Sequence, residues 1–199
     1  MPSALDSAER VEVTSRAAWR AWLGAHHAQP DGVWLVTYKK HTGTHYLDYD
    51  SIVEEALCFG WIDSLPRKLD AERTMLYVSP RKPKSIWSRL NKARVVALED
   101  AGLMTGVGRA KIEAAKADGS WAIYDSVEDV IVPKDLRFAL DDEPDAAVQF
   151  EAFSPSSKKG VLWWIKSAKR DATRTRRIAE TVRLAKLGVV ANTPAARRR

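Results

Sequence analysis

The sequence has very little cysteine and no long apolar run, and both absences narrow the class of protein. Its single cysteine, Cys58, excludes a disulfide framework within the chain. No apolar stretch approaches the roughly 18–20 residues that span a bilayer, and the first residues lack the basic and apolar regions of a secretory signal. Ten glycines and nine prolines without a period exclude collagen-like and low-complexity architectures. We therefore expect a cytoplasmic protein with no integral membrane segment.

The length and composition are those of an ordinary globular protein. A chain of 199 residues can form one domain or two small ones. Hydrophobic residues make up 45% of it and charged residues 29%, which provides enough apolar surface for a core and excludes a wholly disordered chain. Eight tryptophans are many for this length, so an interpretation of the sequence has to say which of them lie in the core and which in a binding site.

The net charge of +6 conceals a strong segregation of charge along the chain. Residues 64–94 carry a net charge of +7 and residues 158–199 one of +11, whereas residues 118–151 carry −8. Basic segments of this kind can steer anionic partners toward one surface. Weak, non-specific binding of nucleic acid is one such function, and it would fall steeply as salt rises. The alternative is that the acidic segment lies against a basic one inside the same fold.

Short runs of β-branched and aromatic residues predict strands, and apolar residues spaced three and four apart predict helices. We expect an α+β fold that is mainly helical, with a small antiparallel sheet of three or four strands packed with about seven helices. The expected strands cover residues 9–13, 33–38, 62–65 and 75–78. The expected organisation is a core with the sheet in residues 1–132, a C-terminal helical subdomain in residues 133–187, and a disordered basic tail in residues 188–199.

Residues 54–64 join the end of a predicted helix to a strand through a glycine and Trp61. This corner could present Trp61 and Asp63 together, with Glu55 one face away. A carboxyl group beside an indole in a partly dry pocket can have a raised pKa and act as an acid or a base. Glu55 and Asp63 are therefore the candidate catalytic residues. In the alternative interpretation, Trp61 belongs to the core and Asp63 caps a turn or forms an ion pair.

Residues 80–94 place several basic side chains just before a predicted helix that begins at Ser85. Free backbone N–H groups at a helix start, together with the helix dipole, favour an anion such as phosphate or carboxylate. An indole for stacking and an amide for hydrogen bonding lie four residues apart on one face of that helix. The alternative is a tryptophan packed in the core, with Ser85 as a plain cap and the lysines in solvent. The residues expected to bind the ligand here are Trp61, Arg81, Lys84, Ser85, Trp87 and Asn91.

Residues 166–177 repeat this arrangement at a second predicted helix, which Asp171 can cap. Arginine forks suit bidentate binding of phosphate or carboxylate. If this cluster meets residues 80–94 in space, the two form one positive cleft. The alternative is that these cations complement helix dipoles and pair with the acidic segment. The candidate ligand-binding residues here are Lys169, Thr173, Arg174 and Arg177.

The sequence contains no pattern that predicts a metal or a cofactor. His26 and His27 are adjacent and point apart on a helix, and Cys58 lies in an apolar helical turn. Neither a phosphate-binding Gly-rich loop followed by lysine nor a nucleophile elbow is present. We therefore expect no metal site and no cofactor.

Four strings, in order along the chain, resemble one known family. They are Gly32-Val33-Trp34-Leu35 with Lys39-Lys40, the run from Glu54 to Ser64, the run from Pro80 to Ser88 continued to Met104, and Trp164 to Arg170 continued to Glu180. On these strings, which cover about residues 17–187, the chain resembles the bacteriocin-protection family, also called YdeI/OmpD-associated proteins. The resemblance implies a protective role and no established reaction or substrate. Members are often described as periplasmic, unlike the location expected above.

These observations favour a binding protein over an enzyme. We expect a cytoplasmic stress-protection protein with a cationic, tryptophan-lined site for a small anionic ligand. The alternative is an enzyme that acts on a small anionic substrate through Glu55 or Asp63, and a second alternative is nucleic-acid binding through the basic segments. A closed pocket that joins Trp61 and Asp63 to Trp87 would favour a ligand or a substrate. The sequence leaves open the ligand, the oligomeric state and whether turnover occurs.

Overall fold

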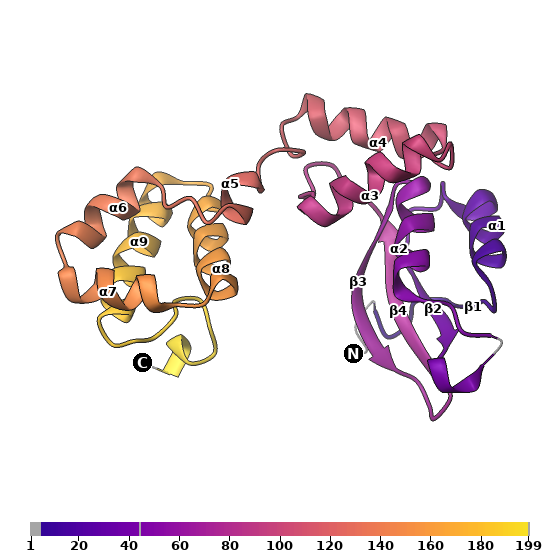
Figure 1. Ribbon diagram of the computed structural model, residues 1–199, viewed down its shortest axis with the longest axis horizontal. Coiled ribbons are helices and arrows are strands. Elements are labelled where there is room, and N and C mark those ends of the chain that lie inside the picture. The colour runs from indigo at the N-terminus through magenta and orange to yellow at the C-terminus, as the bar shows by residue number, and fades with distance from the viewer. Residues whose placement is uncertain (1–4, 44, 199) are drawn as a thin grey trace. The chain divides into compact units, whose positions relative to one another are not determined.

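The first part of the chain is built around a four-stranded mixed sheet (Figure 1). The spatial order of the strands is β1-β2-β4-β3, in which β1 is parallel to β2 and the other neighbours are antiparallel. The expectation of an antiparallel sheet is wrong for β1, because a helix lies between β1 and β2 and lets the chain cross over to run in the same direction. The strands are β1 (Arg10–Glu12), β2 (Val33–Tyr38), β3 (Trp61–Lys68) and β4 (Arg73–Pro80).

The computed structural model describes residues 5–43 and 45–198, and helices dominate this part of the chain. The α+β, mainly helical fold class is therefore confirmed. The α-helices are α1 (Arg16–His26), α2 (Tyr49–Cys58), α3 (Arg89–Asp100), α4 (Gly106–Ala117), α5 (Asp125–Glu128), α6 (Lys134–Asp141), α7 (Pro144–Ala152), α8 (Pro155–Lys166) and α9 (Asp171–Ala185). Two short 3-10 helices are η1 (Lys40–Thr42) and η2 (Ala196–Arg198).

The chain divides into two compact units, Met1–Ile123 and Tyr124–Arg199, and each has its own hydrophobic core. The second unit begins before the expected boundary at residue 133, because Val127 of α5 is buried in the second core. Residues 188–199 were expected to form a disordered tail. Within the described residues, however, Ala191 is buried in that same core and Ala196–Arg198 form η2; Arg199 lies outside the described residues.

Buried tryptophans tie α1 and α2 to one face of the sheet in the first unit. Trp19 of α1 and Trp61 of β3 are completely buried. Each indole N–H donates to a backbone carbonyl, Trp19 Nε1 to Ile52 O at 3.1 Å and Trp61 Nε1 to His27 O at 3.1 Å. Because a buried N–H without an acceptor destabilises a fold by about 1–3 kcal/mol, these bonds let large aromatic side chains fill the core.

Gly32 lies just before β2, where the backbone of β4 comes very close. A Cβ atom at this position would lie 2.6 Å from Val78 O and 2.6 Å from Ser79 Cβ. These distances are far below van der Waals contact, so the pairing of β2 with β4 requires a residue without a side chain at position 32.

We predict that Gly32→Ala lowers the free energy of unfolding by about 1–3 kcal/mol, because the added methyl group overpacks the contact with β4. Gly24→Ala is the matched control, since no described atom lies within 4 Å of the Cβ that it adds to α1. This control should instead raise the free energy of unfolding by about 1 kcal/mol, because alanine is the better helix former. Urea unfolding of the three proteins measures both effects, and a neutral Gly32→Ala would contradict the close approach.

Candidate functional site

Residues 81–88 connect β4 to α3 and form the candidate site of the first unit. Arg81 N donates to Gly60 O at 2.9 Å, which holds the start of this segment against the corner that follows α2. Lys84 has φ 61°, in the left-handed region that side chains other than glycine rarely adopt. Ser85 N then donates to Lys82 O at 3.2 Å and closes a turn. Tertiary contacts therefore hold this turn in place, against the local preference of Lys84.

The expectation that a helix begins at Ser85 is wrong. The side chain of Ser88 caps α3 by accepting a hydrogen bond from Asn91 N at 3.2 Å. Ser85 Oγ instead accepts a hydrogen bond from Arg81 Nη1 at 3.4 Å. Either serine could cap a helix, and the burial of Trp87, one residue before the cap, favours Ser88. The free N–H groups of a helix start are therefore not at Ser85, and an anion site there needs a different basis.

Arg81 provides that basis, because it is a buried cation with part of its hydrogen-bonding capacity unused. The residue is 3% exposed, and its guanidinium carbon lies 3.6 Å from the centroid of the Trp87 ring, which is itself buried. Nη1 donates to Ile86 O at 3.1 Å. Nε and Nη2 are buried and find no hydrogen-bond partner anywhere in residues 5–43 and 45–198. Burial lowers the pKa of Arg81 to about 10, an effect that Asp63 opposes, so the guanidinium stays charged at neutral pH.

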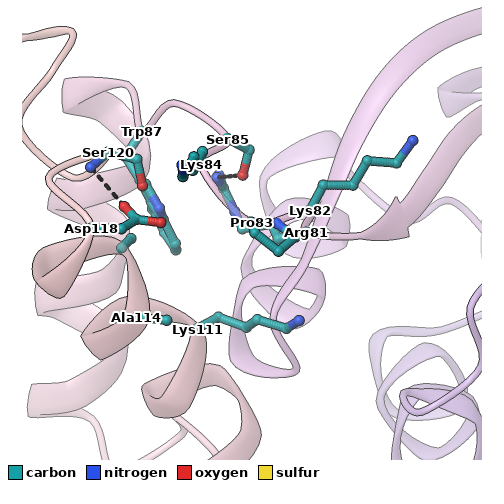
Figure 2. Close-up of a pocket in the computed structure, with 11 residues that line it drawn as sticks. Arg81, Lys82, Pro83, Lys84, Ser85, Trp87, Lys111, Ala114, Asp118 and Ser120 are labelled. Carbon is teal, nitrogen blue, oxygen red and sulfur yellow. Dashed lines mark hydrogen bonds between the residues drawn. The ribbon is translucent and has the colours of Figure 1, made fainter.

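Arg81 lines a cavity of about 90 Å³ between residues 81–87 and the region of α4 (Figure 2). Lys82 and Lys84 from the first segment and Lys111 from α4 also line it, so cations outnumber the single carboxylate of the lining. Since one water needs roughly 10–15 Å³ by this kind of measure, the cavity has room for several waters or for one small oxyanion. Its size and its charge both fit a small anionic group.

The α4 side of this cavity contributes one acceptor and one hydroxyl group. Asp118 is exposed, and its Oδ1 accepts a hydrogen bond from Ser120 N at 2.9 Å (Figure 2). Ser120 Oγ is buried, and within the described part of the chain it has no hydrogen-bond partner of good geometry. Because Asp118 lies in solvent, screening weakens its repulsion of an anion. The open edge of Arg81 remains as a donor.

Not all of the residues predicted for this site border the cavity. Arg81, Lys84, Ser85 and Trp87 line it together, as the sequence suggested. Trp61 belongs to the core, with its N–H bound to a backbone carbonyl. Asn91 is nearly buried, and its Oδ1 accepts a hydrogen bond from Arg94 Nη1 at 2.9 Å, so its amide is used within α3.

The two candidate catalytic carboxylates have different surroundings. Glu55 is 2% exposed and lies under two arginines of α1, with Oε1 at 2.6 Å from Arg16 Nε and Oε2 at 2.6 Å from Arg20 Nη1. Asp63 is half-buried on β3, and its Oδ2 accepts the hydroxyl of Tyr49 at 2.6 Å. Glu55 therefore stabilises the packing of α1 on α2, whereas Asp63 faces a cleft.

The second cluster of predicted ligand residues lies in the second unit, where its arginines are engaged. Arg174 makes a bidentate pair with Asp135, at 2.6 and 2.9 Å. Arg177 donates to the backbone carbonyl of Trp164 and to Ser167 Oγ. Thr173 is half-buried and Lys169 is exposed. The arginines of α9 thus join helices within this unit, which corresponds to the alternative interpretation of this segment.

The described residues contain neither a cluster of metal ligands nor a membrane-spanning helix. Among residues 5–43 and 45–198, no three histidine, cysteine, aspartate or glutamate side chains gather as a metal ion would require. Cys58 is buried, and burial raises the pKa of its thiol, so it stays protonated at neutral pH. None of the helices in this part of the chain is both long and apolar enough to cross a membrane.

Sequence reasoning did not find the α4 side of the cavity. Lys111, Asp118 and Ser120 follow Arg81 by some thirty residues and show no motif of their own. Their contribution depends on how α4 packs beside residues 81–87, and no local pattern reports such packing. The sequence did contain a signal for the burial of Arg81. A basic residue that directly follows a strand and precedes a tryptophan is a candidate for packing against that ring.

The fold and the site define a two-unit α+β protein with a cation-lined cavity in its sheet-containing unit. The chain belongs to the family described as Domain of unknown function (DUF8412), whose model matches residues 11–111. Residues 129–188 match the model described as Bacteriocin-protection, YdeI or OmpD-Associated. The resemblance to YdeI/OmpD-associated proteins is thereby confirmed in the second unit, and the first three resembling strings lie within residues 11–111. No curated protein and no solved structure matches the chain.

We predict that the double variant Arg16→Ala/Arg20→Ala lowers the free energy of unfolding by about 3–5 kcal/mol, because it leaves Glu55 buried without a partner. Urea unfolding measures the effect. Arg109→Ala is the control, since its ion pair with Glu99 is largely exposed and should contribute less than about 1 kcal/mol. If the double variant is as stable as this control, Glu55 does not depend on the two arginines.

Proposed function

We propose that this YdeI/OmpD-associated protein binds a small oxyanion, or the carboxylate of a larger molecule, in the cavity beside Arg81. Binding of this ligand would serve the protective role that the family description suggests. The observation that carries the proposal is the buried guanidinium of Arg81, two of whose nitrogens, Nε and Nη2, have no hydrogen-bond partner among the described residues. A buried charge is strongly unfavourable unless a counter-charge and hydrogen bonds compensate for it, and an anion in the cavity would supply both.

The geometry of the free edge supports a ligand with two adjacent oxygens. Nε and Nη2 lie along one edge of the planar guanidinium, and this edge can donate two parallel hydrogen bonds to a carboxylate, phosphate or sulfate. Trp87 covers one face of the group, and the bond to Ile86 O occupies Nη1. These contacts hold the open edge in one orientation, so little side-chain freedom is lost when the anion binds.

The size of the cavity limits the ligand. About 90 Å³ accommodates one phosphate-sized group and no complete nucleotide. A larger ligand would place only its anionic end beside Arg81, where Lys84 and Lys111 add positive charge. Weak binding of nucleic acid through residues 64–94 and 158–199 stays a prediction, and the cavity does not depend on it.

We predict that parent protein binds inorganic phosphate, measured by isothermal titration calorimetry, and that Arg81→Met weakens this binding at least tenfold. Arg67→Met is the matched control, since Arg67 also lies over an indole, 4.7 Å from the Trp34 ring centroid, but does not line the cavity. It should leave the phosphate affinity unchanged. Arg81→Lys should weaken binding nearly as much as Arg81→Met, because an ammonium group lacks the planar fork.

The stabilities of the same proteins give an independent readout. A hundredfold excess of phosphate over the Kd should stabilise parent by about 2.7 kcal/mol through mass action. In chloride buffer, Arg81→Met should be as stable as parent or more stable, since it removes an uncompensated buried charge. Phosphate also stabilises proteins by exclusion from their surfaces. The specific effect is therefore the gain in the free energy of unfolding of the parent protein on adding phosphate, minus the same gain for Arg81→Met. Equal increments in these two proteins would contradict the proposal.

A further inference from the structure

The first unit contains a second and larger cleft, of about 650 Å³, at the N-terminal end of α2. Figure 1 shows the β3–β4 hairpin extending past this end of the helix. Residues of the sheet, such as Thr37 and Leu76, form one side of the cleft, and the loop after β2 and the first turn of α2 form the other. Cavities of roughly 300–1,000 Å³ are typical of sites for small organic molecules.

The cleft has an apolar floor and aromatic side chains at its mouth. Buried aliphatic side chains line its interior, and two tyrosines are unusually exposed, Tyr46 at 42% and Tyr49 at 51%. Exposed rings beside a buried apolar floor favour a ligand with a flat apolar body. The buried floor residues, which belong to the core on the α2 face of the sheet, are Leu47, Ile52 and Leu76.

Asp63 supplies the negative charge of this cleft. The register of β3 against β4 shifts between Asp63 and Pro66, and both residues line the cleft. Tyr49 donates its hydroxyl to Asp63 Oδ2 at 2.6 Å. No donor among the described residues reaches Asp63 Oδ1, which leaves one carboxylate oxygen open to a ligand.

Two lysines line the cleft together with Asp63. Lys39 Nζ donates to two backbone carbonyls, Asp70 O at 2.5 Å and Ala71 O at 2.9 Å, which engage two of its three N–H groups. Lys40 is exposed, and solvent screens its charge. Burial, with a further contribution from the bond to Asp63, raises the pKa of Tyr49 to about 12. Tyr49 therefore remains a donor at neutral pH.

We propose that this cleft binds a small aromatic amine, with the ring on the apolar floor and the ammonium group against Asp63 Oδ1. A carboxylate within a partly apolar site makes a strong charge-assisted hydrogen bond to an ammonium group, and tyrosine rings attract cations through their faces. The residues that line this cleft and those that line the Arg81 cavity are different. The two sites therefore have separate linings, although the charges of Arg81 and Asp63 attract each other.

The test compares two probes that share a ring and a spacer and differ in charge, tryptamine and indole-3-propionate. Isothermal titration calorimetry on parent should show that tryptamine binds at least tenfold more tightly than indole-3-propionate. Asp63→Asn keeps the shape of the side chain and should weaken tryptamine binding at least tenfold, which corresponds to about 1.4 kcal/mol. Tyr46→Ala changes an exposed side chain, so it should fold normally, and it should weaken binding at least threefold.

Glu113→Gln is the control, because Glu113 is an exposed carboxylate of α4 that pairs with Lys116 and does not line the cleft. Its affinity for tryptamine should stay within twofold of parent. Arg81→Met should bind tryptamine at least as tightly as the parent protein, because it removes a cation that attracts Asp63, and this result separates the tryptamine site from the anion cavity. The proposal is overturned if parent shows no heat with millimolar tryptamine, if indole-3-propionate binds as tightly, or if Asp63→Asn binds tryptamine like parent.

Discussion

The contact between Arg81 and Trp87 determines the shape of the candidate site. Arg81 enters the interior directly after β4, and the Trp87 ring covers one face of its guanidinium at 3.6 Å. Burying both groups holds the connecting segment in a turn, and α3 begins after Ser88. Arg81 also lines the cavity that residues of α4 border, and the charge of its buried guanidinium is not fully compensated.

Two buried or half-buried carboxylates show why burial alone does not identify a functional residue. Glu55 is almost completely buried, and each of its oxygens is paired with an arginine. Neither oxygen is therefore open to a ligand. Asp63 is more exposed and lines a cleft, and the described residues give it one hydrogen bond, from Tyr49 to Oδ2. The distinguishing property is unused hydrogen-bonding capacity next to an open volume, and Arg81 shares it.

The two units use their arginines in different ways. In the second unit, which carries the bacteriocin-protection, YdeI or OmpD-associated match, Arg174 and Arg177 bind Asp135 and the residues that end α8. This packing links α9 to its neighbours and explains part of the strong positive charge of residues 158–199 without a ligand. The free guanidinium edge and the larger cleft both belong to the first unit, where the two proposed ligands have opposite charge.

Local patterns were enough to predict the fold class, the four strands and the basic segment before α3, because strand and helix periodicities depend on neighbouring residues. They also brought Arg81, Lys84, Ser85 and Trp87 together, since these residues are close in the chain. The direction of β1, the true cap of α3 and the α4 wall of the cavity were decided only by the tertiary structure. Ser85 and Ser88 are both suitable helix caps by local rules. The burial of Trp87 favours Ser88 as the cap of α3. Hydrogen bonds that remain unmade, as at Arg81 and Asp63, are likewise a property of packing and leave no trace in sequence.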